Sequence, residues 1–284
     1  MRVVSHLAQL QARAEGGVRM RIVFWGASGE CGTTSSMAAV AGYHALRRGG
    51  RSFCLQLKPG GDFELFFSPW EKRTAFKEES TYYALEGMDY LIRQEQRHRL
   101  DRDCIRESLL PLFDYRLFCL PCGMRKKTEL YPLQSLALQR RVALCMERYA
   151  DLLYIDAGHE RGVLGDELVQ SADVVVVNFS GVQKELEEFF SSPFRCRGRL
   201  VYLLADYDNE QVYNAANLHR IYRTRERDTC VLPANPLFAQ ACAHGRLEPF
   251  LKKIFRGRES QRDEQFTREL SRTARLITEV GADG

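Results

Sequence analysis

The hydrophobic residues of this chain fall into short continuous runs separated by longer amphipathic stretches. The runs are rich in β-branched and aromatic residues and are bounded by glycine, proline or charged residues, which is typical of strands. We therefore predict strands at residues 21–25, 52–57, 116–120, 152–155, 173–178, 200–204 and 229–232. Residues 174–177 are apolar at every position, as in a strand buried on both sides.

Between these runs the apolar residues recur at helical spacing. The clearest predicted helices cover residues 34–48, 132–149, 182–190, 211–222 and 236–254. Strands that alternate with helices of this length usually form a parallel sheet with helices packed on both faces. The pattern therefore predicts an α/β fold with a doubly wound, mostly parallel sheet.

The chain contains no internal repeat and no low-complexity linker, so we expect one continuous domain over residues 20–256. Within it, residues 58–111 carry aromatic side chains among charged ones, which favours an irregular lobe inserted beside the main sheet. A polar N-terminal extension, residues 1–19, precedes a second methionine, Met20. Residues 257–284 have apolar positions at near-helical spacing and should form a C-terminal helix that packs on the domain.

Composition narrows the class of protein. The chain has 284 residues, of which 45% are hydrophobic, so it can bury a substantial core. No apolar run approaches the roughly 20 residues that span a bilayer, and no secretory signal pattern is visible, so we expect a cytoplasmic protein. The nine cysteines are scattered along the chain, and we expect them to be reduced thiols. Cys119 and Cys122 form a CxxC pair without the second pair that a metal site would need.

The net charge is only +4, but the basic residues are mostly arginine, with clusters at residues 195–199 and 220–227. Clusters of this kind can bind the phosphate backbone of DNA. Glu226 and Asp228 interleave with the second cluster, which favours solvated, locally neutralised faces instead.

The segment GASGECGTTSSMAAVAG, residues 26–42, joins a predicted strand to a predicted helix. In such a turn the main-chain N–H groups and the helix N-terminus converge on phosphate. The general pattern is GxxxxGK[ST]. The register that works here places Ala27 at the first glycine, Gly32 at the second, Thr33 at the lysine and Thr34 at the hydroxyl residue.

In that register SGECGTTSS resembles the KGGxGKTT loop of the MinD/ParA family of P-loop ATPases. LLYIDAGHE, ADVVVVNFSGVQKELEEFF and CVLPANPLFAQACAHGRLEPFL resemble later landmarks of that family and occur in the same order. The resemblance covers about residues 20–256. It is greatest to the CpaE/TadZ branch of pilus-assembly localising proteins.

The resemblance implies a site for ATP or ADP, with Mg²⁺ bound by Thr34 and, through water, by Asp156. It also implies a homodimer that forms through the face bearing the loop. The implied nucleotide-binding residues are Gly26, Ala27, Ser28, Gly29, Glu30, Cys31, Gly32, Thr33, Thr34, Ser35 and Pro233.

The departures from the family pattern concern charge. Ser28 replaces the lysine that reaches across the dimer, and Thr33 replaces the ordinary P-loop lysine. After the second strand the family carries DxDP, where this chain has Gln56, Leu57, Lys58 and Pro59. Loss of one electrostatic donor of this kind typically costs about 10²-fold or more in rate. The degenerate loop therefore predicts slow hydrolysis or none.

Several functions remain open at this point. The chain could be a positional or assembly scaffold, for example for a pilus, that binds nucleotide as a ligand. Lys58 could supply the missing charge in a slow ATPase that depends on Asp156. The loop could also be a tight turn capped by Thr33 or Thr34, without nucleotide, or the arginines could bind DNA nonspecifically.

Two smaller motifs also leave alternatives. His159 and Glu160 follow the predicted strand of Asp156 and are candidates for a phosphate-sensing switch. Residues 250–255, FLKKIF, resemble a short membrane-binding helix, but ordinary packing of a penultimate helix is favoured, so peripheral membrane contact is not expected.

Overall fold

The computed structural model describes residues 20–48, 50–56, 63–68, 87–121, 132–147, 149–159, 163–257 and 261–279. The N-terminal extension, Lys58, Cys122 and Glu160 lie outside these residues, as does a large part of the predicted lobe at 58–111.

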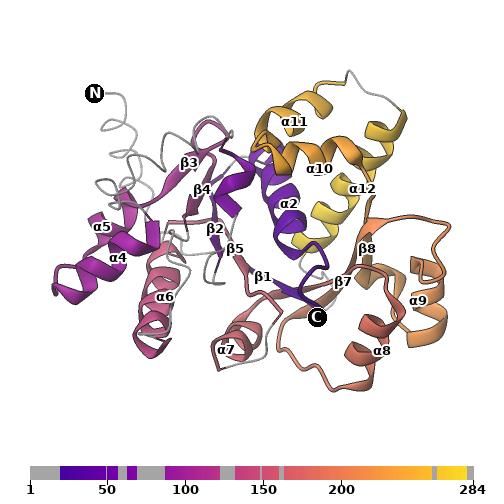
Figure 1. Ribbon diagram of the computed structural model, residues 1–284, viewed down its shortest axis with the longest axis horizontal. Helices are drawn as coiled ribbons and strands as arrows, with labels where there is room; N and C mark the ends of the chain where they lie inside the picture. The colour runs from indigo at the N-terminus through magenta and orange to yellow at the C-terminus, as the bar shows by residue number, and fades with distance from the viewer. Residues whose placement is uncertain are drawn as a thin grey trace.

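The fold is built on an eight-stranded sheet (Figure 1). Its order is β3-β4-β2-β5-β1-β6-β7-β8, and all neighbours are parallel except the edge pair β3 and β4. This arrangement confirms the predicted doubly wound, mostly parallel sheet. The strands are β1 (Met20–Gly26), β2 (Ser52–Gln56), β3 (Leu110–Leu112), β4 (Leu117–Leu120), β5 (Leu152–Asp156), β6 (Val174–Phe179), β7 (Arg199–Tyr207) and β8 (Thr229–Pro233).

Helices cover both faces of the sheet (Figure 1). One layer contains α2 (Thr33–Arg47), α10 (Pro236–Ala243), α11 (Leu247–Ile254) and α12 (Gln261–Thr278). The opposite layer contains α4 (Gly87–Gln96), α5 (Arg102–Glu107), α6 (Pro132–Glu147), α7 (Val163–Ser171), α8 (Gln183–Ser191) and α9 (Ala215–Tyr222). Short 3₁₀ turns lie at η1 (Phe63–Phe66) and η2 (Glu226–Asp228).

The central strand β1 is apolar from Ile22 to Trp25 because both faces are covered. Ile22 and Phe24 point into the core shared with α2, α11 and α12, while Val23 and Trp25 point into the core on the other face. All four side chains are buried. Since successive side chains of a strand alternate between faces, a strand covered on both sides has no position for a polar residue.

All seven predicted strands are present, but one predicted helix was wrong. Residues 236–254 form two helices, α10 and α11, because Gly245 lies between them with φ of 66°, a left-handed conformation that favours glycine. A Cβ at Gly245 would also lie 1.9 Å from the carbonyl oxygen of Ser68. Any larger residue there would separate α10 from the η1 segment.

The predicted helix at 211–222 begins later, at Ala215, because Asn214 caps it by accepting a hydrogen bond from the N–H of Asn217. The amphipathic pattern did not predict α4, α5, α7 or the antiparallel strand β3.

The FLKKIF segment packs inside the molecule. Leu251 and Ile254 of α11 are buried in the core with α2, so its apolar face is already covered. This agrees with the preferred packing interpretation. Within the part of the chain that the structure describes, no helix is both long and apolar enough to cross a membrane.

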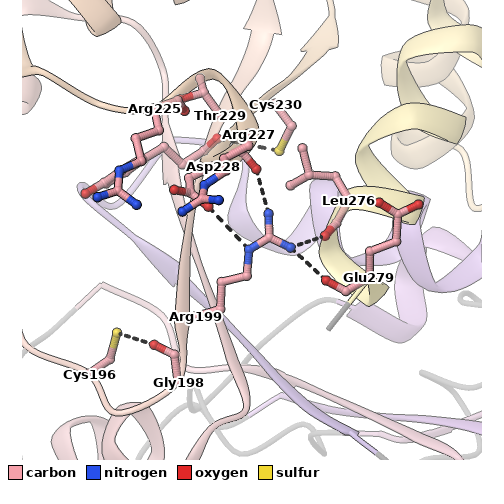
Figure 2. Close-up of polar contacts among 11 residues, drawn as sticks. Cys196, Gly198, Arg199, Arg225, Arg227, Asp228, Thr229, Cys230, Leu276 and Glu279 are labelled. Carbon is pink, nitrogen blue, oxygen red and sulfur yellow. Dashed lines mark hydrogen bonds and ion pairs between the residues drawn. The ribbon is translucent and has the colours of Figure 1, made fainter. Parts of the chain in front are cut away.

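Arg199 forms hydrogen bonds that link the C-terminal helix α12 to the sheet (Figure 2). Arg199, the first residue of β7, donates from Nη1 to the carbonyl oxygens of Leu276 and Glu279, both at 2.8 Å. Its Nη2 donates to the carbonyl of Arg227 at 2.6 Å, and its Nε lies 3.3 Å from a carboxylate oxygen of Asp228. The guanidinium thus caps the carbonyl end of α12, where a positive charge is favourable.

Arg199→Met is expected to destabilise the chain by about 1–2 kcal/mol, because it removes a charged donor from three carbonyls, of which that of Leu276 is partly buried. The last turn of α12 should lose hydrogen-exchange protection more than the sheet does. Urea unfolding and amide exchange measure both effects. The matched control is Arg268→Met. The side chain of Arg268 is 73% exposed and pairs with Glu269, so it should contribute little to stability. An equal loss in both variants would contradict the capping role.

Candidate functional site

The loop at residues 27–32 lies at the carboxyl edge of the sheet, between β1 and α2. The N–H of Gly26 donates to the carbonyl of Gly158 at 2.7 Å, and that of Ala27 donates to the carbonyl of Asn178 at 3.0 Å. The ends of β1, β5 and β6 therefore meet at this loop. In open parallel sheets, ligands bind in the crevice outside such strand ends.

The start of α2 depends on a glycine. Gly32 is the N-cap with φ of 72°, and its carbonyl accepts hydrogen bonds from the N–H of Ser36 at 2.9 Å and the hydroxyl of Ser35 at 3.0 Å. No side chain caps the helix. The alternative in which Thr33 or Thr34 is the N-cap is therefore wrong, because the left-handed Gly32 takes that position.

Side chains of the loop fold toward its own interior. Cys31 is 2% exposed, donates its thiol to the carbonyl of Ser28 at 3.1 Å, and lies 3.3 Å from Oγ1 of Thr33. A Cβ at Gly26 would lie only 2.7 Å from both the Ser28 carbonyl oxygen and Thr33 Oγ1. The residue in the lysine position, Thr33, thus turns back onto the loop, which is tightly wound.

An acidic side chain binds the residue in the second lysine position. The hydroxyl of Ser28 donates to Oε1 of Glu185 at 2.7 Å. The other oxygen of Glu185 accepts from both the N–H and the hydroxyl of Ser180, each at 2.8 Å. Glu185 belongs to α8 and is only 6% exposed. At the position where the sequence resemblance implied a lysine, the structure has a hydroxyl held by a buried carboxylate.

The two predicted metal ligands are brought together. Oγ1 of Thr34 donates to Oδ2 of Asp156 at 2.6 Å. The same oxygen accepts from the amide of Gln56 at 2.9 Å, and Oδ1 accepts from the N–H of Gly158 at 3.0 Å. Asp156 is 2% exposed, so three protein donors surround a buried carboxylate.

Gln56 acquires its position from strand pairing. It stands directly beside Asp156 in the register of β2 and β5, and its amide oxygen accepts the N–H of Phe63 at 3.1 Å. Sequence reasoning noted Gln56 only as a missing acid. A polar residue at the end of an otherwise apolar strand was the signal that could have identified it as part of the site.

His159 lies against the loop from outside. A Cβ at Gly29 would approach its ring carbon Cε1 to 3.3 Å, so the imidazole packs beside this glycine. This contact places the candidate switch residue at the loop. Glu30 is exposed to solvent at the tip of the turn.

Pro233 ends β8, three positions from β1 in the sheet. It lines a pocket of about 460 Å³ with Tyr207 and Asn209, and no loop residue lines that pocket.

Charge is the main property of the site. Among the residues that the structure describes, the side chains that hydrogen-bond to the loop include no lysine or arginine, whereas Asp156 and Glu185 bring two buried carboxylates. The described residues also contain no cluster of three or more histidine, cysteine or acidic side chains that could hold a metal ion. An anion entering here would meet no cation supplied by these residues.

Comparison with known proteins was made at the level of sequence and of structure. No protein-family model matches the sequence, and no curated protein matches it. The fold is similar to a ParA family ATPase from Chlorobium tepidum TLS, with a TM-score of 0.67 and 11% identity over 91% of this chain and 98% of that chain.

Two similar structures contain nucleotide. The septum site-determining protein MinD from Pyrococcus horikoshii, complexed with Mg-ADP, has a TM-score of 0.61 and 11% identity over 93% of this chain and 99% of that chain. A McdA variant from Cyanothece in complex with ATP has a TM-score of 0.55 and 14% identity over 90% and 98%. At these identities the likeness establishes the fold that this chain shares with them.

Proposed function

We propose, on the premise that this chain has the fold of the ParA and MinD ATPases, that it is a dimerising scaffold for positioning or assembly. In this proposal its degenerate loop binds ATP or ADP weakly or not at all and does not support useful hydrolysis. The observation that carries the proposal is the composition of the loop site: two buried carboxylates and no lysine or arginine within the described residues that contact it.

The residues fit a metal better than they fit a triphosphate. The oxygens of Thr34 and Asp156 are donors that Mg²⁺ prefers. A triphosphate, however, carries several negative charges, and buried charges are unfavourable unless they are paired. Thr33 and Ser28, which stand where cations are needed, are engaged with Cys31 and Glu185. The donor set therefore supports weak metal binding more than it supports nucleotide binding.

Exposed apolar side chains at the same edge support dimerisation through the loop-bearing face. Val182, Val212 and Leu237 follow β6, β7 and β8 and are 57%, 73% and 46% exposed. A Cβ at Gly181 would lie 2.9 Å from the amide oxygen of Gln211, which places the first two valines on adjacent loops. Large apolar side chains gathered on one face are typical of protein interfaces. The resemblance to the CpaE/TadZ branch points to a pilus apparatus as the assembly served.

Titration calorimetry with ATP, ADP and GTP, with and without Mg²⁺, tests the proposal. We expect dissociation constants of about 1 mM or weaker, equivalent to about −4 kcal/mol of binding free energy. Sedimentation of the same samples should show a dimer that does not require nucleotide. Micromolar Mg-ATP binding, with phosphate release that disappears in Asp156→Ala, would instead establish a slow ATPase.

A further inference from the structure

A second concave site lies at the amino edge of the sheet, at the opposite end of α2 from the loop. It is a pocket of about 280 Å³ between the end of α2, the turn that joins β3 to β4, and the end of α11. Because α2 has 15 residues, the two sites are separated by roughly 22 Å along the helix axis. Its apolar floor is formed by Leu46 and Phe255, which are partly exposed, above Ala45 and Phe113, which are each 1% exposed.

The rim of this pocket is cationic and includes Arg47, Arg116, Lys252 and Arg256. Lys252 is neutralised, since its Nζ lies 2.7 Å from Glu248 and 3.0 Å from Asp114. The guanidinium of Arg47 lies over the ring of Phe255, 5.1 Å from its centroid. Arg116 and Arg256 are exposed and form no ion pair with any described residue. Two positive charges therefore lie beside the apolar floor with no acidic partner among the described residues.

The turn that positions Arg116 is held in an unusual conformation. Phe113, Asp114 and Tyr115 have φ values of 49°, 55° and 65°, three successive non-glycine residues in the left-handed region. This conformation is costly for residues with a Cβ. α11 stabilises it, because Glu248 accepts the N–H of Phe113 at 3.2 Å while Lys252 binds Asp114. Strained backbone of this kind persists where the surrounding structure imposes it, often at ligand sites.

We propose that this pocket binds an acidic peptide segment of a partner protein. An apolar side chain of the segment would pack on the floor at Leu46 and Phe255, and flanking carboxylates would pair with Arg116 and Arg256. The planar guanidinium groups can bind carboxylates through two parallel hydrogen bonds. A nucleic-acid backbone would satisfy the arginines but would leave the apolar floor uncovered, so the mixed lining favours a peptide.

Fluorescence anisotropy tests the proposal with a fluorescein-labelled octapeptide, Glu-Asp-Glu-Leu-Phe-Glu-Asp-Glu, and the intact chain. The double variant Arg116→Ser/Arg256→Ser should weaken binding by about tenfold or more, since each lost charged pair contributes on the order of 1 kcal/mol. The matched control, Arg223→Ser/Arg225→Ser, removes two exposed arginines between α9 and β8 and should change binding less than about twofold. Circular dichroism confirms that both variants are folded.

Two further binding measurements distinguish a peptide ligand from a phosphate ligand. Replacing Leu-Phe in the probe by Ser-Ser should weaken binding to the wild-type chain, because the floor is then left empty. No measurable peptide binding, or equal losses in the two double variants, would overturn the proposal. So would tighter binding of a single-stranded oligonucleotide or of phosphatidylglycerol vesicles that depends on Arg116 and Arg256, since the ligand would then be a phosphate.

Discussion

Thr33→Lys is expected to raise the affinity of this chain for Mg-ATP by roughly 10- to 100-fold. Thr33 begins α2 in the position where the P-loop pattern has lysine, and its Oγ1 turns inward to within 3.3 Å of Cys31 Sγ. A lysine at this position would extend toward the phosphates and supply a positive charge. None of the described side chains that hydrogen-bond to the loop carries one. A hydrogen bond to a charged group contributes about 1.5–3 kcal/mol, which corresponds to this gain. Calorimetry against Mg-ATP measures it.

Thr33→Met is the matched control, because it adds comparable length without charge and should leave the affinity near that of the wild type. Ser28→Lys provides a second comparison. Its ammonium would lie beside the carboxylate of Glu185, which Ser28 contacts at 2.7 Å, so we expect a smaller gain in affinity. If Thr33→Lys bound no more tightly than Thr33→Met, the shape of the loop rather than its missing charge would be the reason for weak binding.

The folded chain is expected to lose about 2 kcal/mol of stability between pH 7 and pH 5 through His44 alone. His44 is 2% exposed, its Nδ1 is hydrogen-bonded to the hydroxyl of Tyr154, and burial together with the nearby charge of Arg48 lowers its pKa to about 3. In the unfolded chain a histidine has a pKa of about 6.5. The unfolded state therefore binds more protons below pH 6.5, and stability falls by about 1.4 kcal/mol per pH unit until about pH 3.

Urea unfolding at pH 7 and pH 5 measures this dependence. His44→Gln cannot titrate, so its loss of stability between the two pH values should be smaller than that of the wild type by about 2 kcal/mol, whatever its absolute stability. His98→Gln, at an exposed histidine, should retain the wild-type difference. Equal pH differences in the wild type and His44→Gln would show that this buried ring is not the source.

Most of the sheet and its order of elements could be predicted from local sequence. The apolar runs within β1, β2, β4, β5, β6, β7 and β8 are recognisable because a strand covered on both faces has mostly apolar side chains along its central part, with polar residues near its ends. The loop of the candidate site was equally visible, since Gly29 and Gly32 lie between a strand and a helix. These features depend on residues that are neighbours in the chain, so short stretches of sequence are enough to predict them.

The break between α10 and α11 could not be predicted from the neighbouring sequence alone. Gly245 alone would be tolerated in a helix, although at some cost. The left-handed φ of 66° at Gly245 ends α10. The carbonyl of Ser68, which comes from a distant segment and lies 1.9 Å from the position a Cβ would take, leaves room for glycine but not for a larger residue. A contact with another part of the chain thus explains why glycine is required at this break.

The chemical character of both sites arises from tertiary pairing. Gln56 meets Asp156 because β2 and β5 are neighbours in register, and Glu185 reaches Ser28 from α8. Arg116 and Arg256 share a pocket because the β3–β4 turn packs against α11. Local sequence predicts strands and turns through periodicity and main-chain preference. It does not predict which side chains lie together, because those distances depend on how far-separated segments pack.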